Sequence, residues 1–150
     1  MRECTYLLEA LLTHRPPMLL LDQVIGYDER HLAARVTITE ASLFLAPQGV
    51  PAYLAIEYMA QACGAFAGVT ALDAGEPVKI GFLIGARGCR LLAPWFRVGD
   101  QLLVSSALVF RDEQMAVFDC KIEIAGELAA AARLNVYQPD NALLGVDESG

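Results

Sequence analysis

Basic residues and histidines are scarce in this 150-residue chain, and the shortage argues against several kinds of function. Eleven Lys and Arg face eighteen Asp and Glu, for a formal net charge of −7 at pH 7. So acidic a chain is poorly suited to nucleic acid as its main partner. Its two histidines are far apart, and its four cysteines lack the C-x-x-C spacing of zinc sites. We therefore expect no metal site and no cofactor, and reduced thiols of a cytoplasmic protein.

A targeting segment is also not evident. Residues 1–12 carry acids inside their apolar run and lack a small-residue cleavage site, so we expect no signal peptide. Residues 50–72 are long and apolar enough to suggest a membrane span. Their small residues, their Glu and Gln and the lack of a flanking basic cluster favour a buried helix instead. The high apolar fraction of the chain, 55%, predicts a large oligomer interface.

The length and the hydrophobic pattern predict one domain over residues 1–137, with residues 138–150 as a flexible tail. A central helix is expected to begin at Pro51 and to end before the breaker cluster at residues 73–77. Alternating apolar and polar residues predict strands, which we place at residues 18–27, 31–39, 79–92, 101–110, 116–124 and 128–137. Three glycines predict a bulge in residues 79–92, and the alanines of residues 128–137 would also suit a helix. With a short helix at residues 5–12, the predicted fold is α+β, with five or six antiparallel strands wrapped around one long helix.

Four residues of the central helix share one face by their spacing: Glu57, Gln61, Gly64 and Gly68. Glycine inside a helix costs roughly 1 kcal/mol relative to alanine, so the two glycines predict close approach of another backbone. Glu57 is the helix's only charged residue before Asp73. It either accepts hydrogen bonds near the helix N-terminus or acts as a proton donor or acceptor, with its protonated form favoured by a dry, apolar setting.

Three motifs are found at residues 14–24 (H-R-P-P-M-L-L-L-D-Q-V), residues 51–64 (P-A-x4-E-x-M-A-Q-x2-G) and residues 97–102 (R-V-G-D-Q-L). They resemble those of the hotdog-fold 3-hydroxyacyl-acyl carrier protein dehydratases. The resemblance covers residues 7–137 and is nearest to the shorter dehydratase-like subunits of aryl-polyene gene clusters. It implies a hotdog dimer with acyl tunnels at the interface, acting with an acyl carrier protein in fatty-acid or polyene biosynthesis.

The same resemblance implies roles for single residues. Glu57 matches the family glutamate that protonates the departing 3-hydroxyl, while a histidine from the preceding loop removes the C2 proton. Ala52 matches the position at the helix start whose backbone N–H polarises the thioester carbonyl. Gln61 and Tyr53 fall at further substrate-binding positions.

The loop before the central helix departs from the family. It reads S-L-F-L-A-P-Q-G over residues 42–49, where the family has His-Phe-Pro-Gly. The base is then His14, or Glu57 in both roles, or a histidine from a related hotdog subunit in a hetero-dimer. A thioesterase using Glu57 and a non-catalytic acyl-binding subunit are further alternatives. His14 also suits a structural role, and His31, beside a polar turn, suits a solvated one.

The basic residues are concentrated in one stretch. Between Pro77 and Gly99 there is no acid, yet four cations occur there: Lys79, Arg87, Arg90 and Arg97. Acyl carrier proteins are acidic, so this stretch is a candidate docking patch. The alternative is that it forms the solvated edge of a strand.

Overall fold

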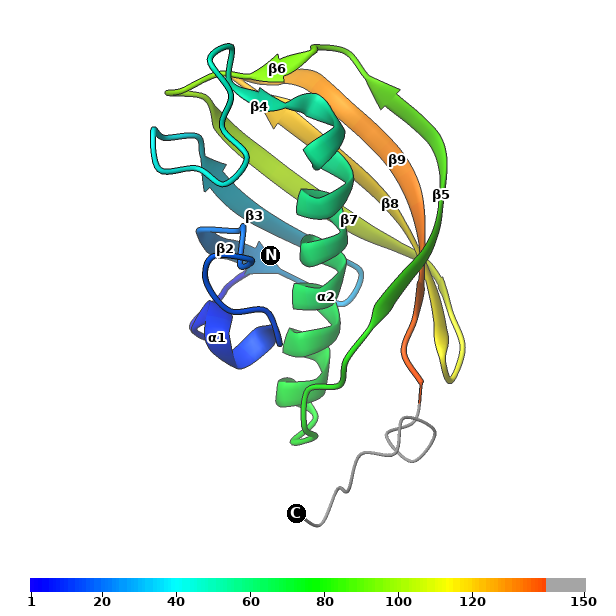
Figure 1. Ribbon diagram of the computed structural model, residues 1–150. Coiled ribbons are helices and arrows are strands. Elements are labelled where there is room, and N and C mark those ends of the chain that lie inside the picture. The colour runs from blue at the N-terminus through cyan, green and yellow to red at the C-terminus, as the bar shows by residue number, and fades with distance from the viewer. Residues whose placement is uncertain (140–150) are drawn as a thin grey trace.

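A long helix, α2 (Ala55–Asp73), lies across the concave side of a curved antiparallel sheet in the computed structural model, which describes residues 1–139 (Figure 1). The sheet has seven strands in the order β1-β2-β3-β7-β8-β9-β5. Their bounds are β1 Arg2–Glu3, β2 Gln23–Tyr27, β3 His31–Thr37, β5 Phe82–Leu91, β7 Gln101–Arg111, β8 Met115–Ile124 and β9 Glu127–Tyr137. The shorter elements are α1 Leu8–Leu11, the 3-10 turn η1 Ala52–Leu54, and the paired strands β4 Val50–Pro51 and β6 Trp95–Phe96.

The predicted α+β architecture, with a long helix and a large antiparallel sheet, is confirmed. The sheet exceeds the predicted five or six strands because the two-residue β1 pairs with β2. Residues 18–22, predicted as strand, lie outside β2, and the predicted helix at residues 5–12 shrinks to α1. The alanines of β9 are in a strand because β8 and β5 pair with it on both sides. β5 carries the predicted bulge, with Gly88 at φ 58°.

Crowding by the end of α1 explains the two glycines of α2. A Cβ at Gly68 would collide with the backbone carbonyl oxygen of Leu11, and one at Gly64 would lie 2.9 Å from Cδ2 of the Leu12 side chain. The predicted close approach of another backbone is therefore confirmed at Gly68 but not at Gly64, where the neighbour is a side chain. At Gly68 only glycine lets the two backbones come this close.

The face of α2 that carries Glu57 is not fully covered. Its partly exposed residues follow helical spacing: Ile56, Glu57, Ala60, Gly64, Ala67 and Ala71. The prediction of a helix buried all round is therefore wrong for the chain by itself. In the part of the chain that the structure describes, β5, the last strand of the sheet, pairs on one side only.

The two ends of the described chain are both anchored. The Asp73 carboxylate, at the end of α2, accepts hydrogen bonds from the hydroxyls of Tyr6 and Tyr27 and pairs with Arg2. The two hydroxyls and Arg2 hold the pKa of Asp73 below its usual value. Gln138, placed in the predicted tail, bonds to the backbone oxygens of Gln114 and Lys79. Residues 140–150, the rest of that tail, lie outside the described residues.

Candidate active site

Glu57 and His14 face each other at one end of the α2 groove. Glu57 sits in the first turn of α2, and its Oε1 lies 4.0 Å from Nε2 of His14. The Glu57 side chain is 40% exposed and that of His14 37% exposed. Glu57 is therefore partly exposed in the single chain, and the prediction that it is held dry at an interface of two subunits stays a prediction. The structure does bring the two candidate catalytic side chains together.

His14 is carried by the strap, which we define as residues 12–20, the segment that crosses α2. Arg15 fixes the local path of the strap by donating from Nη1 to the carbonyl oxygens of Leu12 at 2.9 Å and His14 at 2.8 Å. Nδ1 of His14 is buried and has no hydrogen-bond partner among the described residues. The imidazole is therefore positioned by its backbone and by packing, with one ring nitrogen near a carboxylate.

Gln61 holds the strap and Glu57 together. Its Oε1 accepts the N–H of Leu20 at 2.8 Å, and its Nε2 donates to the carbonyl of Met18 at 2.7 Å. The same Nε2 lies 3.5 Å from Oε1 of Glu57. Gln61 is only 1% exposed. Its polar atoms are engaged inside the protein, although Gln61 also lines the cavity, so its predicted role in substrate binding stays a prediction.

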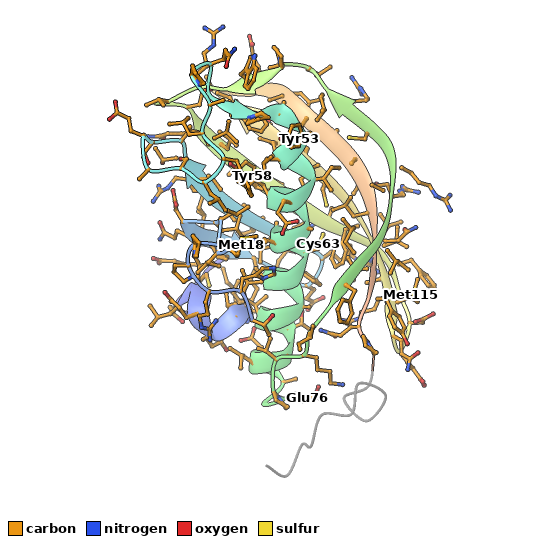
Figure 2. All side chains as sticks on the ribbon, viewed as in Figure 1. Met18, Tyr53, Tyr58, Cys63, Glu76 and Met115 are labelled. Atoms are coloured by element: carbon orange, nitrogen blue, oxygen red, sulfur yellow. The ribbon has the colours of Figure 1, made fainter. Side chains whose placement is uncertain are left out.

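A cavity of about 550 Å³ begins at this pair and follows α2 toward its C-terminal end. One wall is made by small α2 residues: Ala60, Gly64, Ala67 and Ala71. The opposite wall comes from β5, β8 and β9, with Phe82, Met115 and Val136, and Figure 2 shows Met115 on the sheet side of α2. The volume falls within the usual range for small-molecule sites, and the wall combines apolar residues along α2 with polar and charged residues at its far end, among them Glu76, Lys79 and Arg111. The arrangement suits an elongated apolar ligand whose polar end reaches Glu57 and His14.

Ala52 and Tyr53 lie outside this cavity. They border a second, shallower hollow together with residues 91–94, and Tyr53, at the start of the helix in Figure 2, is 67% exposed. The N–H of Ala52 donates to the carbonyl oxygen of Pro94 at 3.0 Å. The pairing of β4 with β6 brings that oxygen into place. Ala52 is therefore not the free backbone donor that the resemblance implied.

The four predicted docking cations are spread along the β5 edge. Arg87 and Arg90 lie on β5, on either side of its bulge, while Lys79 and Arg97 lie beyond its opposite ends (Figure 1). They border the edge strand but do not form one compact cluster. Lys79 lines the far end of the cavity.

The remaining candidates for ligand chemistry are few. His31 begins β3 and bonds through Nδ1 to Asp28 at 3.0 Å, in an exposed turn far along the chain from Glu57. Among residues 1–139 no group of three or more His, Cys, Asp or Glu is placed to hold a metal ion. No helix in that part of the chain is both long and apolar enough to cross a membrane.

Comparison with known proteins decides the family. Residues 6–145 match the family described as ApeP-like, ApeP dehydratase. The chain belongs to the ApeP-like dehydratase family. It is 32% identical over 130 residues to the 3-hydroxyacyl-[acyl-carrier-protein] dehydratase FabZ of Halorhodospira halophila, covering 83% of this chain and 84% of that protein.

Solved structures agree with the assignment. The dehydratase heterocomplex ApeI:P from Xenorhabdus doucetiae contains a chain that superposes with a TM-score of 0.87 at 33% identity, over 93% of this chain and 95% of that one. A hypothetical thioesterase from Streptococcus pneumoniae, solved with coenzyme A, superposes with a TM-score of 0.63 at 13% identity, over 78% and 84% of the two chains. The second likeness shows the shared fold alone. The predicted hotdog fold, the predicted family and the predicted dehydratase class are confirmed.

Sequence reasoning missed how the site is built. It found the glutamate and the glutamine from their spacing on the helix, but not that Gln61 binds backbone groups more than forty residues earlier. No side-chain pattern reports a contact made by a backbone N–H. The one available signal was a buried amide four residues after a carboxylate, because such an amide must find partners.

Proposed function

We propose that the protein dehydrates 3-hydroxyacyl thioesters carried by an acyl carrier protein, in fatty-acid or polyene biosynthesis, and works beside a second hotdog subunit. The main observation in support is the Glu57–His14 pair at the head of a cavity that is apolar along α2. The FabZ relative is a 3-hydroxyacyl-[acyl-carrier-protein] dehydratase, which supports the substrate class. The ApeI:P structure is a dehydratase heterocomplex, which supports the kind of assembly.

Elimination of water needs an acid and a base on neighbouring substrate atoms. Glu57 donates its proton to the 3-hydroxyl, which leaves as water. The base removes the C2 proton, and the electron pair of that C–H bond forms the double bond of the enoyl thioester. The thioester bond itself stays intact. Transfer of the abstracted proton from base to Glu57 restores the starting state.

Two sources of the base fit the site. Nε2 of His14, 4.0 Å from Oε1 of Glu57, is close enough for a proton to pass between the two after a small movement. The alternative base is a histidine of the second hotdog subunit, which would enter across the open face of α2. That face, with Glu57 40% exposed, has room for a partner's side chain.

Substrate binding uses the start of the helix and the edge of the sheet. The Tyr53 N–H has no acceptor among the described residues, so we place the thioester carbonyl there instead of at Ala52. The acidic carrier protein contacts the exposed side chains of Arg87 and Arg90, whereas the unpaired backbone edge of β5 is left to the second hotdog subunit.

The test follows two products from a 3-hydroxyacyl carrier protein, the enoyl thioester and free thiol, with this protein alone and with its hotdog partner. We expect enoyl thioester and no thiol. Glu57→Gln removes the proton donor at nearly constant shape and should lower the rate at least about 100-fold, the lower range for general acid catalysis. Unchanged circular dichroism controls for folding.

His14→Gln separates the two bases. Loss of activity both alone and with the partner identifies His14 as the base, whereas full activity in the complex assigns that role to the partner's histidine. Free thiol from the wild type would replace the proposal with a thioesterase. Full activity of Glu57→Gln, or carrier binding without any turnover, would overturn the catalytic proposal in favour of a non-catalytic subunit.

A further inference from the structure

Two buried thiols meet between the central helix and the sheet, away from the Glu57–His14 pair. Sγ of Cys63, on α2, lies 3.4 Å from Sγ of Cys120, on β8, although the residues are 57 positions apart in the chain. They are 1% and 4% exposed, respectively. Figure 2 shows Cys63 on the side of α2 that faces the sheet. The dehydration mechanism uses neither thiol.

The contact is held in place by its neighbours. Phe66, one turn further along α2, packs edge to face on Phe118 of β8, with ring centroids 5.5 Å apart. This second contact fixes the helix against the strand close to the thiols. A disulfide needs about 2.05 Å between its sulfurs, so the thiols must approach by about 1.4 Å more. Rotation of the two side chains and a small shift of the helix can supply that movement.

The surroundings of Cys120 leave room for this rotation. In the sheet it lies directly opposite Ser106 on one side and Ala132 on the other, both small. The hydroxyl of Ser106 is buried and has no hydrogen-bond partner among the described residues. Directly opposite residues in an antiparallel pair have Cβ atoms about 4.5–5.5 Å apart on the same face. Ser106 can therefore donate to a thiolate on Cys120, the form that attacks an oxidised sulfur.

The cavity lies against the pair, so an oxidant that enters it needs a local movement of the wall to reach Cys63, which is 1% exposed. Cys63 is one of the residues that line the cavity running from Glu57 along α2. A molecule as small as hydrogen peroxide fits a space of about 550 Å³ with room to spare. Burial raises the pKa of the Cys63 thiol well above its usual value, which disfavours the reactive thiolate, so the pair stays reduced until peroxide accumulates in the cavity.

We propose that Cys63 and Cys120 form a redox modification site, at which a peroxide converts the dithiol to a disulfide that ties α2 to β8. The Cys63 sulfur attacks the peroxide and becomes a sulfenic acid, with release of one water. Cys120 then attacks that sulfur and displaces the second water. The two thiols lose two electrons and two protons, which reduce one hydrogen peroxide to two waters. A dithiol reductant reverses the bond.

Cys89 serves as an internal reference for the extent of oxidation, because it is exposed on β5, whereas Cys4 is half-buried. The native protein is treated with increasing hydrogen peroxide, denatured, alkylated and analysed as peptides by mass spectrometry. We expect a linked Cys63–Cys120 peptide, lighter by two hydrogens than the two thiol peptides, that disappears on reduction. The melting temperature of the cross-linked protein should rise by roughly 10 °C, because the bond closes a long loop.

A matched pair of variants isolates the effect. The variant Cys4→Ser/Cys89→Ser keeps only the buried pair. On peroxide treatment, Cys63 and Cys120 should become resistant to alkylation together. Adding Cys120→Ala should leave Cys63 without a partner and abolish both the loss of two hydrogens and the rise in melting temperature. The proposal is overturned if both buried thiols stay alkylatable in wild-type protein whose Cys89 is fully oxidised, or if either gains oxygen without a cross-link. Neither outcome depends on the dehydratase assignment.

Discussion

Gln61 is the residue on which the geometry of the candidate site depends. Its side chain bridges the backbone of the strap at Leu20 and Met18 and reaches Glu57, all from a position 1% exposed. His14 belongs to the same strap. The buried amide of Gln61 therefore contacts the Glu57 carboxylate and also holds the strap that carries His14.

Replacing Gln61 with Leu should harm both stability and catalysis. The change keeps the volume close but leaves the N–H of Leu20 without its acceptor, which should lower the free energy of unfolding by about 1–3 kcal/mol. Because Glu57 loses its neighbour, kcat should fall more than KM changes. Chemical denaturation and steady-state kinetics measure the two effects.

Gln23→Leu is the matched control, since Gln23 is exposed and bonds only to Arg35 in the described chain. It should change stability by less than about 1 kcal/mol and leave kcat as it is. A Gln61→Leu enzyme with unchanged kcat at saturating substrate would show that Gln61 supports the fold without positioning Glu57.

The central helix has two faces with different tasks. One packs on the sheet and under α1, where its glycines allow contact with Leu11 and Leu12. The other is half-exposed and lines the cavity. Gly68 thus serves packing and Gly64 borders both α1 and the cavity, whereas Glu57 and the alanines beside the cavity serve the proposed chemistry.

Alanine at the two glycines should have unequal effects. Alanine favours a helix by about 1 kcal/mol over glycine. At Gly64 the new methyl meets the end of the flexible Leu12 side chain, which can rotate away, so the net change should be small. At Gly68 it meets the backbone of Leu11, which cannot, and overpacking of this kind costs about 1–3 kcal/mol. Thermal and urea unfolding of the two variants in parallel provide the comparison; equal stability would show that α1 shifts freely.

The whole molecule presents one edge that looks incomplete. Within residues 1–139, β5 pairs only with β9, yet it and its flanks expose large apolar side chains: Ile80, Phe82, Leu83, Ile84, Leu91 and Leu92. An unpaired strand with exposed apolar residues is a template for another chain. The same edge borders the open face of α2, so a subunit bound here would also cover Glu57.

Ile84→Asp should prevent this assembly without unfolding the chain. Ile84 is 55% exposed, so the carboxylate is solvated in the free chain but desolvated at an interface. Association with the hotdog partner, or with a second copy, should weaken at least about 100-fold, by the cost of burying an unpaired charge. Sedimentation velocity measures the change. Val109→Asp, at a 42% exposed position of β7, is the control and should assemble normally. An Ile84→Asp protein that assembles like the wild type would place the interface elsewhere.

The sequence by itself determined the long helix, most of the strands and Glu57, because these follow from local periodicity and from spacing along a single element. The three motifs indicated the family because each is a local run of residues along the chain. Only the tertiary structure decided which groups meet: His14 with Glu57, Gln61 with the strap, and Pro94 with the N–H of Ala52. These contacts join segments distant in sequence, and several use backbone atoms, which every residue shares. A pattern of side chains therefore cannot specify them until the chain has folded.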